Sequence, residues 1–243
     1  MDGLLKLDIL PQPDDVTCGP TCLHAVYRHY GFELPLEELI QSVPQLKGGG
    51  TLAVQLGCDA LRRGFSATIY TADLQVFDPT WFNPPALRMA EHLAERLRKQ
   101  AEVKPWPRMR MSTEGYLEFL SRGGTIKMRD FSAALLRRYL KRSVPILTGL
   151  SATYLYGCSR EHGLTGEPDD IRGESMGHFV VLYGYHTPSH SVLVADPLLA
   201  NPLGPEHHYQ LGADRVIRAI LLGIVTYDAN MLVIEPPAVR KRV

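Results

Sequence analysis

Helix-like and strand-like patterns are separated along this chain. Helical apolar spacing dominates the first half, as in TLAVQLGCDALRRG (51–64), where Thr51 predicts the N-cap and Gly64 the end of a helix. Segregated helices and strands are typical of an α+β domain, so we expect N-terminal helices packed on a C-terminal antiparallel sheet. The runs of strand type are FSATIY (65–70) in the helix-rich half, and VPILTGL (144–150), GHFVVLYGYH (177–186), SVLVADP (191–197) and MLVIEP (231–236) in the second half.

The length of the chain allows one large domain. It has 243 residues, of which 45% are hydrophobic and 21% are charged, so it can bury a core without metal or disulfide support. We expect a single domain over residues 1–243 with a helical insertion at about 71–122. In that region a stretch rich in proline and aromatic residues, FDPTWFNPP (77–85), precedes the charged amphipathic helix expected over 86–100.

The charge balance and the cysteine pattern limit the partners and the compartment. Lys plus Arg and Asp plus Glu are both 26, so no global positive field predicts a nucleic-acid partner. No apolar run approaches the length of a membrane span, and the first ten residues lack the apolar core of a signal peptide. The four cysteines lack the spacing of a disulfide framework. We therefore expect a cytoplasmic protein that does not contact a membrane; the oligomeric state stays open.

Cys18 lies at the mouth of a helix expected over 19–30. The first turn of a helix carries partial positive charge, and a thiol there ionises more easily to the reactive thiolate. Gly19 beside it allows backbone and substrate to approach closely. The alternative is that Cys18 is a small buried hydrophobe, and this stretch alone leaves both interpretations open. We expect Cys22 and Cys58 in the core, and Cys158 is a secondary candidate in a polar loop.

A thiolate nucleophile needs a base and a group that orients this base. His178 opens an apolar strand after Gly177, and Asp196 ends the next strand. Pairing of these strands would bring both side chains together. His178 on its own is also compatible with a satisfied core histidine, and Asp196 with a turn-forming Asp-Pro. Taken together, a cysteine, a histidine and an aspartate that each lie at the end of an element indicate a catalytic triad.

These residues carry a resemblance to a known family. Gln12, Cys18-Gly19, Gly177-His178 and Asp196-Pro197 resemble the pattern of papain-like cysteine peptidases. The pattern is most similar to the double-glycine leader peptidases and their stand-alone relatives without transporter domains. The resemblance implies a papain-like α+β fold and a Cys-His-Asp triad that hydrolyses a peptide or amide bond through an acyl-enzyme. It also implies a peptide or peptide-like substrate and no cofactor.

The resemblance assigns a role to each matching residue. Cys18 would be the nucleophile, His178 the ion-pair partner and proton donor, and Asp196 the residue that orients the imidazole. The side chain of Gln12 and the backbone N–H of Cys18 would form the oxyanion hole. Gly19 and Gly177 would line the substrate site.

Three alternatives remain open. The first is a non-catalytic peptide-binding module on a peptidase fold, and the second is an acyl or peptidyl transferase with the same triad. The third is a metal site built from Cys18, Cys22 and His24 with the pair His207-His208, although no Cys-x-x-Cys knuckle is present. The natural substrate and the cleavage specificity are not encoded in any pattern.

The polar loop over 151–176 is rich in acidic residues. Long loops in compact domains are often lids or binding loops. We expect this loop to border the substrate cleft and to favour a neutral or basic substrate, and a plain solvated loop is the alternative.

Overall fold

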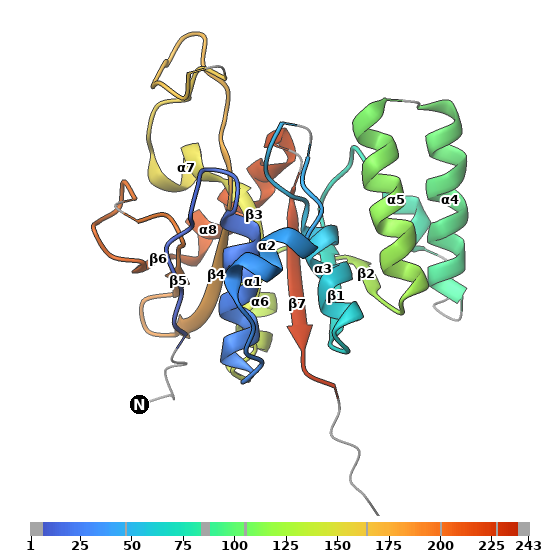
Figure 1. The fold of residues 1–243 in the computed structure, drawn as a ribbon, viewed down its shortest axis with the longest axis horizontal. Helices are drawn as coiled ribbons and strands as arrows, with labels where there is room; N and C mark the ends of the chain where they lie inside the picture. Colours follow the sequence, from blue (N-terminus) through green and yellow to red (C-terminus); the bar gives the residue numbers. More distant parts are fainter. Residues whose placement is uncertain are drawn as a thin grey trace, which may run out of the picture.

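A single mixed sheet of seven strands forms the centre of the protein, in the order β2-β1-β7-β3-β4-β5-β6 (Figure 1). The computed structural model describes residues 7–46, 48–83, 88–104, 106–163, 165–199, 201–226 and 228–237. All neighbouring strands are antiparallel except β1 and β2, which are parallel. The strands are β1 (Ser66–Thr71), β2 (Thr125–Met128), β3 (Ile146–Ser151), β4 (Gly177–His186), β5 (Ser191–Ala195), β6 (His208–Gly212) and β7 (Asn230–Glu235).

Helices cover both faces of the sheet. Helices α1 and α3 contact one face, whereas α6 and α8 pack on the other (Figure 1). No helix in the described ranges is long and apolar enough to cross a membrane. The α-helices are α1 (Cys18–His29), α2 (Leu36–Ser42), α3 (Ala53–Arg62), α4 (Met89–Val103), α5 (Pro107–Ser121), α6 (Ala133–Leu140), α7 (Ala152–Tyr156) and α8 (Ala213–Leu222), and the 3₁₀ helices are η1 (Pro79–Phe82) and η3 (Gly223–Thr226).

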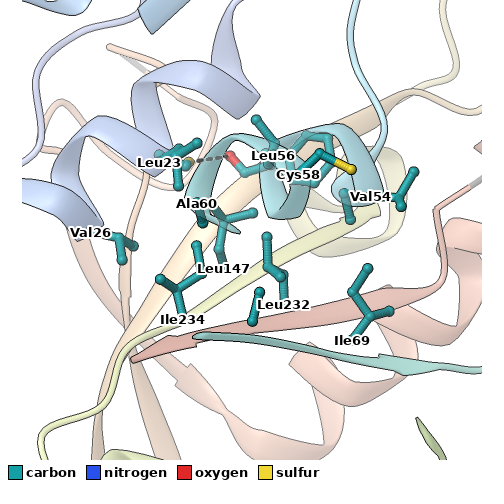
Figure 2. Close-up of a cluster of buried hydrophobic side chains, with 14 of the residues drawn as sticks. Leu23, Val26, Val54, Leu56, Cys58, Ala60, Ile69, Leu147, Leu232 and Ile234 are labelled. Atoms are coloured by element: carbon teal, nitrogen blue, oxygen red, sulfur yellow. Dashed lines mark hydrogen bonds between the residues drawn. The ribbon is translucent and has the colours of Figure 1, made fainter. Parts of the chain in front are cut away.

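The central strands are buried on both faces, which explains their continuous apolar sequence. Successive side chains of a strand point to opposite faces, so Leu147 of β3 joins the core under α1 and α3, while Ile146 joins the core under α6 and α8. Figure 2 shows the first of these cores, with Leu23 of α1 and Leu56 of α3 packed over Leu147 and Leu232. This packing fixes the position of α1 relative to the sheet.

The α+β class is confirmed, and two details of the sheet differ from the sequence prediction. The strand β1 matches the predicted run FSATIY, whereas β2 is an additional strand from the helix-rich half of the chain. They are parallel, which requires a long crossover connection, and the helices α4 and α5 provide it. The strand β7 is last in the sequence but lies in the middle of the sheet, between β1 and β3.

The stretch from 71 to 122 contains η1, α4 and α5. Figure 1 shows α4 and α5 side by side at one end of the molecule, and α5 also contacts α3. The ring of Phe77 contacts the rings of Trp81, Phe82 and Tyr116, so these aromatic residues pack against one another. Residues 84–87, where the helix expected over 86–100 begins, lie outside the described residues. That this stretch is an insertion into a single domain stays a prediction.

The cap of α3 differs from the local pattern. Helix α3 begins after Leu52, and the hydroxyl of Thr51 donates to the carbonyl of Pro44 instead of capping the helix. The N–H of Ala53 donates to a carboxylate oxygen of Asp228 at 2.7 Å, so a residue far along the chain caps this helix. This cap connects α3 to the segment that leads into β7.

Candidate active site

Cys18 is the first residue of α1 and lies at the wall of a cleft. The first turn of α1 contains no acidic residue, and no described side chain caps it, so the partial positive charge of the helix start is not neutralised there. The thiol-bearing residue is 8% exposed. The cleft has a volume of about 780 Å³ and is lined by Cys18, Thr51, Gly149, His178 and Thr226 among others; we call it the Cys18 cleft.

His178 and Asp196 meet at one end of the sheet. His178 is near the start of β4 and Asp196 directly follows β5, and because these strands are antiparallel, both positions lie at the same end. The Nε2 atom of His178 is 2.8 Å from Oδ1 of Asp196. Burial disfavours the charged imidazole, but hydrogen bonds and charges of Asp196 and Cys18 outweigh it and raise the pKa of His178 to about 10. The structure therefore brings Cys18, His178 and Asp196 together.

The Asp196 carboxylate is fully buried and accepts several hydrogen bonds. Oδ1 accepts from the ring of His178 and from the backbone N–H of Leu198 at 2.9 Å. Oδ2 accepts from the hydroxyls of Tyr156 at 2.7 Å and Tyr209 at 2.6 Å. Burial alone would raise the pKa of Asp196, but the bonds and charge of His178, with the bonds of the tyrosines, hold it below its ordinary value. Asp196 is therefore a carboxylate with both oxygens fixed in place.

Sequence reasoning missed Tyr156 and Tyr209. Tyr156 ends the short helix α7 and Tyr209 lies in β6, so neither stands at a recognisable distance from Asp196 in the sequence. Burial and the nearby charge of Asp196 raise the pKa of both hydroxyls, which keeps them protonated as donors. A carboxylate buried beside His178 needs hydrogen-bond donors, but nothing in the sequence marks Asp196 as buried, so no local signal prompted a search for them.

Gln12 lies close to Pro197 and His178 in the segment that precedes α1. Its backbone N–H donates to the carbonyl of Pro197 at 2.9 Å, which ties this segment to the turn after Asp196. Its side-chain Nε2 donates to the carbonyl of Asp14 at 2.8 Å, and the buried Oε1 accepts no hydrogen bond from any described residue. An amide nitrogen carries two hydrogens, so one N–H remains for another acceptor.

A second cleft also borders His178. It has a volume of about 790 Å³ and is lined by Gln12, Tyr156, Gly177, His178 and Leu198 among others; we call it the Gln12 cleft. Gly177 borders both clefts, and a Cβ atom there would come within 3.0 Å of the Thr226 side chain. A larger residue at this position would press against Thr226 in the lining of the Cys18 cleft.

Gly19 does not line either cleft. A Cβ atom on Gly19 would lie 2.5 Å from Cγ2 of Thr51 and 3.3 Å from Phe179, so glycine lets α1 approach its neighbours closely.

The loop over 151–176 borders both clefts. It contributes Arg160 and Glu174 to the Cys18 cleft, and other loop residues line the Gln12 cleft.

Cys22, Cys58 and His24 make contacts outside the site, whereas Cys158 is partly buried and lines the Gln12 cleft. The Cys22 thiol is fully buried and donates to the carbonyl of Phe179 at 3.2 Å, and the His24 ring bonds to the carbonyl of Leu34. Cys58 is fully buried in the core as well. Within the described ranges, no group of three or more His, Cys, Asp or Glu side chains could hold a metal ion.

The fold and this site define the class of protein to which the chain is similar. Helices α1 and α3 on one face of the sheet, with a cysteine at the start of α1 opposite a histidine on β4, form the α+β architecture of papain-like cysteine peptidases. No family model matches the sequence, and no curated protein matches it either.

Solved structures are similar in fold. A C39-like peptidase from Bacillus anthracis superposes with a TM-score of 0.51 at 13% identity, covering 95% of this chain and 95% of that one. The peptidase domain of Streptococcus ComA, a bi-functional ABC transporter in quorum sensing, matches with a TM-score of 0.43 at 14% identity over 95% and 99% of the chains. A double glycine motif protease from an AMS/PCAT transporter, in complex with the leader peptide, matches with a TM-score of 0.45 at 14% identity over 96% and 94%.

Proposed function

We propose that this chain is a cysteine peptidase or amidase that hydrolyses a peptide or amide bond. The observation that carries the proposal is that Cys18, at the positive start of α1, lines one cleft with His178, which a buried carboxylate holds in turn. A thiol, an imidazole and an orienting carboxylate in this order are the components of nucleophilic acyl transfer. The C39 peptidase fold supports the proposal.

The first half of the reaction forms the acyl-enzyme. The Cys18 thiolate attacks the carbonyl carbon, a C–S bond forms, and the carbonyl electron pair moves to oxygen. The remaining amide N–H of Gln12 and the backbone N–H of Cys18 donate to that oxyanion. When the C–N bond breaks, protonated His178 gives its proton to the leaving amine.

The second half releases the acid. Neutral His178 takes a proton from a water molecule as this water attacks the thioester carbonyl. The C–S bond then breaks, and the electron pair returns to Cys18 as the thiolate. Because Nε2 of His178 is held by Asp196, Nδ1 is the nitrogen that exchanges protons with Cys18, the leaving amine and water.

All four cysteines are free, which supports a reducing compartment such as the cytoplasm.

Labelling with a thiol-reactive electrophile at mildly acidic pH tests the proposal. Burial raises the pKa of the Cys22, Cys58 and Cys158 thiols, and that of Cys58 reaches about 12. These three groups therefore stay as unreactive thiols at mildly acidic pH. Peptide mapping should therefore find the label on Cys18 alone. Slow and equal labelling of all four cysteines would contradict the proposal and favour a non-catalytic peptide-binding module.

The two tyrosines that donate to Asp196 act as positioning residues in this proposal. A Tyr156→Phe/Tyr209→Phe double variant should lose about 10-fold in kcat/KM, because Asp196 loses both donors to Oδ2. Loss of these donors also raises the pKa of Asp196, so the acid limb of the rate–pH profile should move to higher pH. Tyr70→Phe is the matched control, since this buried hydroxyl bonds to Tyr139 and not, among the described residues, to Asp196. An unchanged pH profile would reduce the tyrosines to packing residues.

A further inference from the structure

A groove with three arginines adjoins the Cys18 cleft. It has a volume of about 700 Å³, and we call it the arginine groove after Arg160, Arg215 and Arg218, which line it. Arg215 and Arg218 are one turn apart on α8, and Arg160 belongs to the loop over 151–176. No carboxylate is among the described residues that line this groove.

The charges of the three arginines are not neutralised by acidic side chains. Nε of Arg215 donates to the carbonyl of Leu155 at 3.1 Å, and Arg160 donates to backbone carbonyls of its own loop. Among the described residues none of the three arginines forms an ion pair, and Asp214, one turn before Arg218, does not line the groove. Three like charges that face one hollow repel each other and therefore favour a bound anion.

The arginine groove is continuous with the Cys18 cleft. Arg160, Ser175 and Val225 line both hollows, so Arg160 stands at their junction. A peptide held beside Cys18 can therefore extend into the groove. The lining of the Cys18 cleft includes Asp15 and Glu174. The charge of the lining thus changes from largely acidic near the reacting thiol to wholly basic in the groove.

The groove also has an apolar side. Leu222 and Val225 are 40% and 57% exposed and lie in the same lining as the arginines. A guanidinium group binds a carboxylate through two parallel hydrogen bonds, which makes arginine suited to an acidic side chain. An acidic residue with an apolar neighbour therefore matches both parts of the lining.

We propose that the arginine groove binds an Asp or Glu side chain in the part of the peptide substrate that extends beyond the Cys18 cleft. Leu222 and Val225 would contact an apolar residue next to this acid. The inference rests on the proposed peptidase function. It replaces the neutral or basic substrate that the acidic loop over 151–176 predicted with one that carries an acidic residue. This loop supplies a cation, Arg160, to the outer part of the site, so the preferred substrate carries an acid at a distance from the reacting bond.

A positional-scanning peptide library tests the inference. Each position in turn carries either Glu or Gln, and hydrolysis by the wild-type protein is measured at low and high salt. One position should show a KM about 10-fold lower for Glu than for Gln, with kcat unchanged and with a difference that shrinks as salt rises. Arg218→Glu should abolish or reverse this preference. Arg98→Glu, which makes the same charge change on exposed α4, should leave it intact.

Binding measurements separate this inference from the proposed function. The Cys18→Ala protein cannot form an acyl-enzyme, so anisotropy of fluorescently labelled library peptides reports binding alone. A preference for Glu that depends on Arg218 in this protein supports the groove even if the wild-type protein hydrolyses none of the peptides. Equal binding and equal hydrolysis of the Glu and Gln peptides, or loss of the preference in Arg98→Glu as well, would overturn the inference.

Discussion

Cys18→Ala should abolish turnover of every peptide or amide substrate, with a loss of ~10⁵-fold or more in kcat. The reason is that the proposed mechanism forms the acyl-enzyme on the Cys18 sulfur, and Cys18 is the one cysteine among the described residues that line the cleft named after it. Covalent labelling at mildly acidic pH should disappear in the same variant. Steady-state kinetics and intact-mass measurement after treatment with the electrophile check both outcomes.

Cys22→Ala is the matched control for this result. Cys22 lies one helical turn further along α1, is fully buried, and donates its thiol to the carbonyl of Phe179. Its removal should lower the free energy of unfolding by about 1 kcal/mol through lost packing, while turnover and labelling of Cys18 persist. An active Cys18→Ala protein, or a Cys22→Ala protein as inactive as Cys18→Ala, would refute the assignment of the nucleophile.

His178→Ala should be almost as damaging, because the thiolate then loses its counter-ion and the leaving amine loses its proton donor. In the wild-type protein, the contacts with Asp196 and Cys18 raise the pKa of His178 to about 10 against the opposing effect of burial. The protonated form is therefore present at neutral pH, and kcat/KM should fall as the pH rises through about 10. A rate–pH profile measures this alkaline limb.

Asp196→Asn tests whether the charge of Asp196 sets the pH at which activity is lost. The Asp196 carboxylate raises the pKa of His178, so its replacement by a neutral amide lowers this pKa and should move the alkaline limb to lower pH. The loss of activity should be smaller than in His178→Ala, because an amide oxygen can still accept from the imidazole. An alkaline limb that stays in place would separate Asp196 from the titration of His178.

Protonated His178 also contributes to folding stability. Its pKa in the folded protein, about 10, lies above the ordinary value of 6.5, so this contribution is complete below pH 6.5 and disappears as the pH rises through 10. Chemical unfolding of the wild-type protein and of His178→Ala at several pH values measures it. His24→Ala is the matched control, because burial lowers the pKa of His24 and its charge makes no such contribution. Equal pH dependence in wild type and His178→Ala would contradict the raised pKa.

Local patterns predict the elements that bear the candidate site. The apolar runs that became β3, β4, β5 and β7 are buried on both faces, and burial of this kind leaves a continuous apolar signature. Cys18, His178 and Asp196 each stand at the end of such an element, where a polar side chain interrupts an apolar or helical pattern. Their positions are visible in the sequence for that reason, and their catalytic roles stay predictions.

Contacts between distant segments could not be predicted in this way. The cap of α3 by Asp228 and the place of β7 between β1 and β3 depend on which segments pair after the chain has closed long loops. The donors to Asp196 from Tyr156 and Tyr209 belong to the same category. No local spacing encodes such contacts, because each of them is stable only when the whole sheet has formed.

The sequence by itself determined the α+β class, the helix that begins at Cys18 and the hairpin that carries His178 and Asp196, because apolar periodicity and element ends are local properties of a chain. The tertiary structure alone decided that Cys18 and His178 line one cleft, that two tyrosines hold the carboxylate and that three arginines from two segments line one groove. These features depend on the packing of α1, α7 and α8 against the sheet, since only packing brings side chains from distant segments to one place.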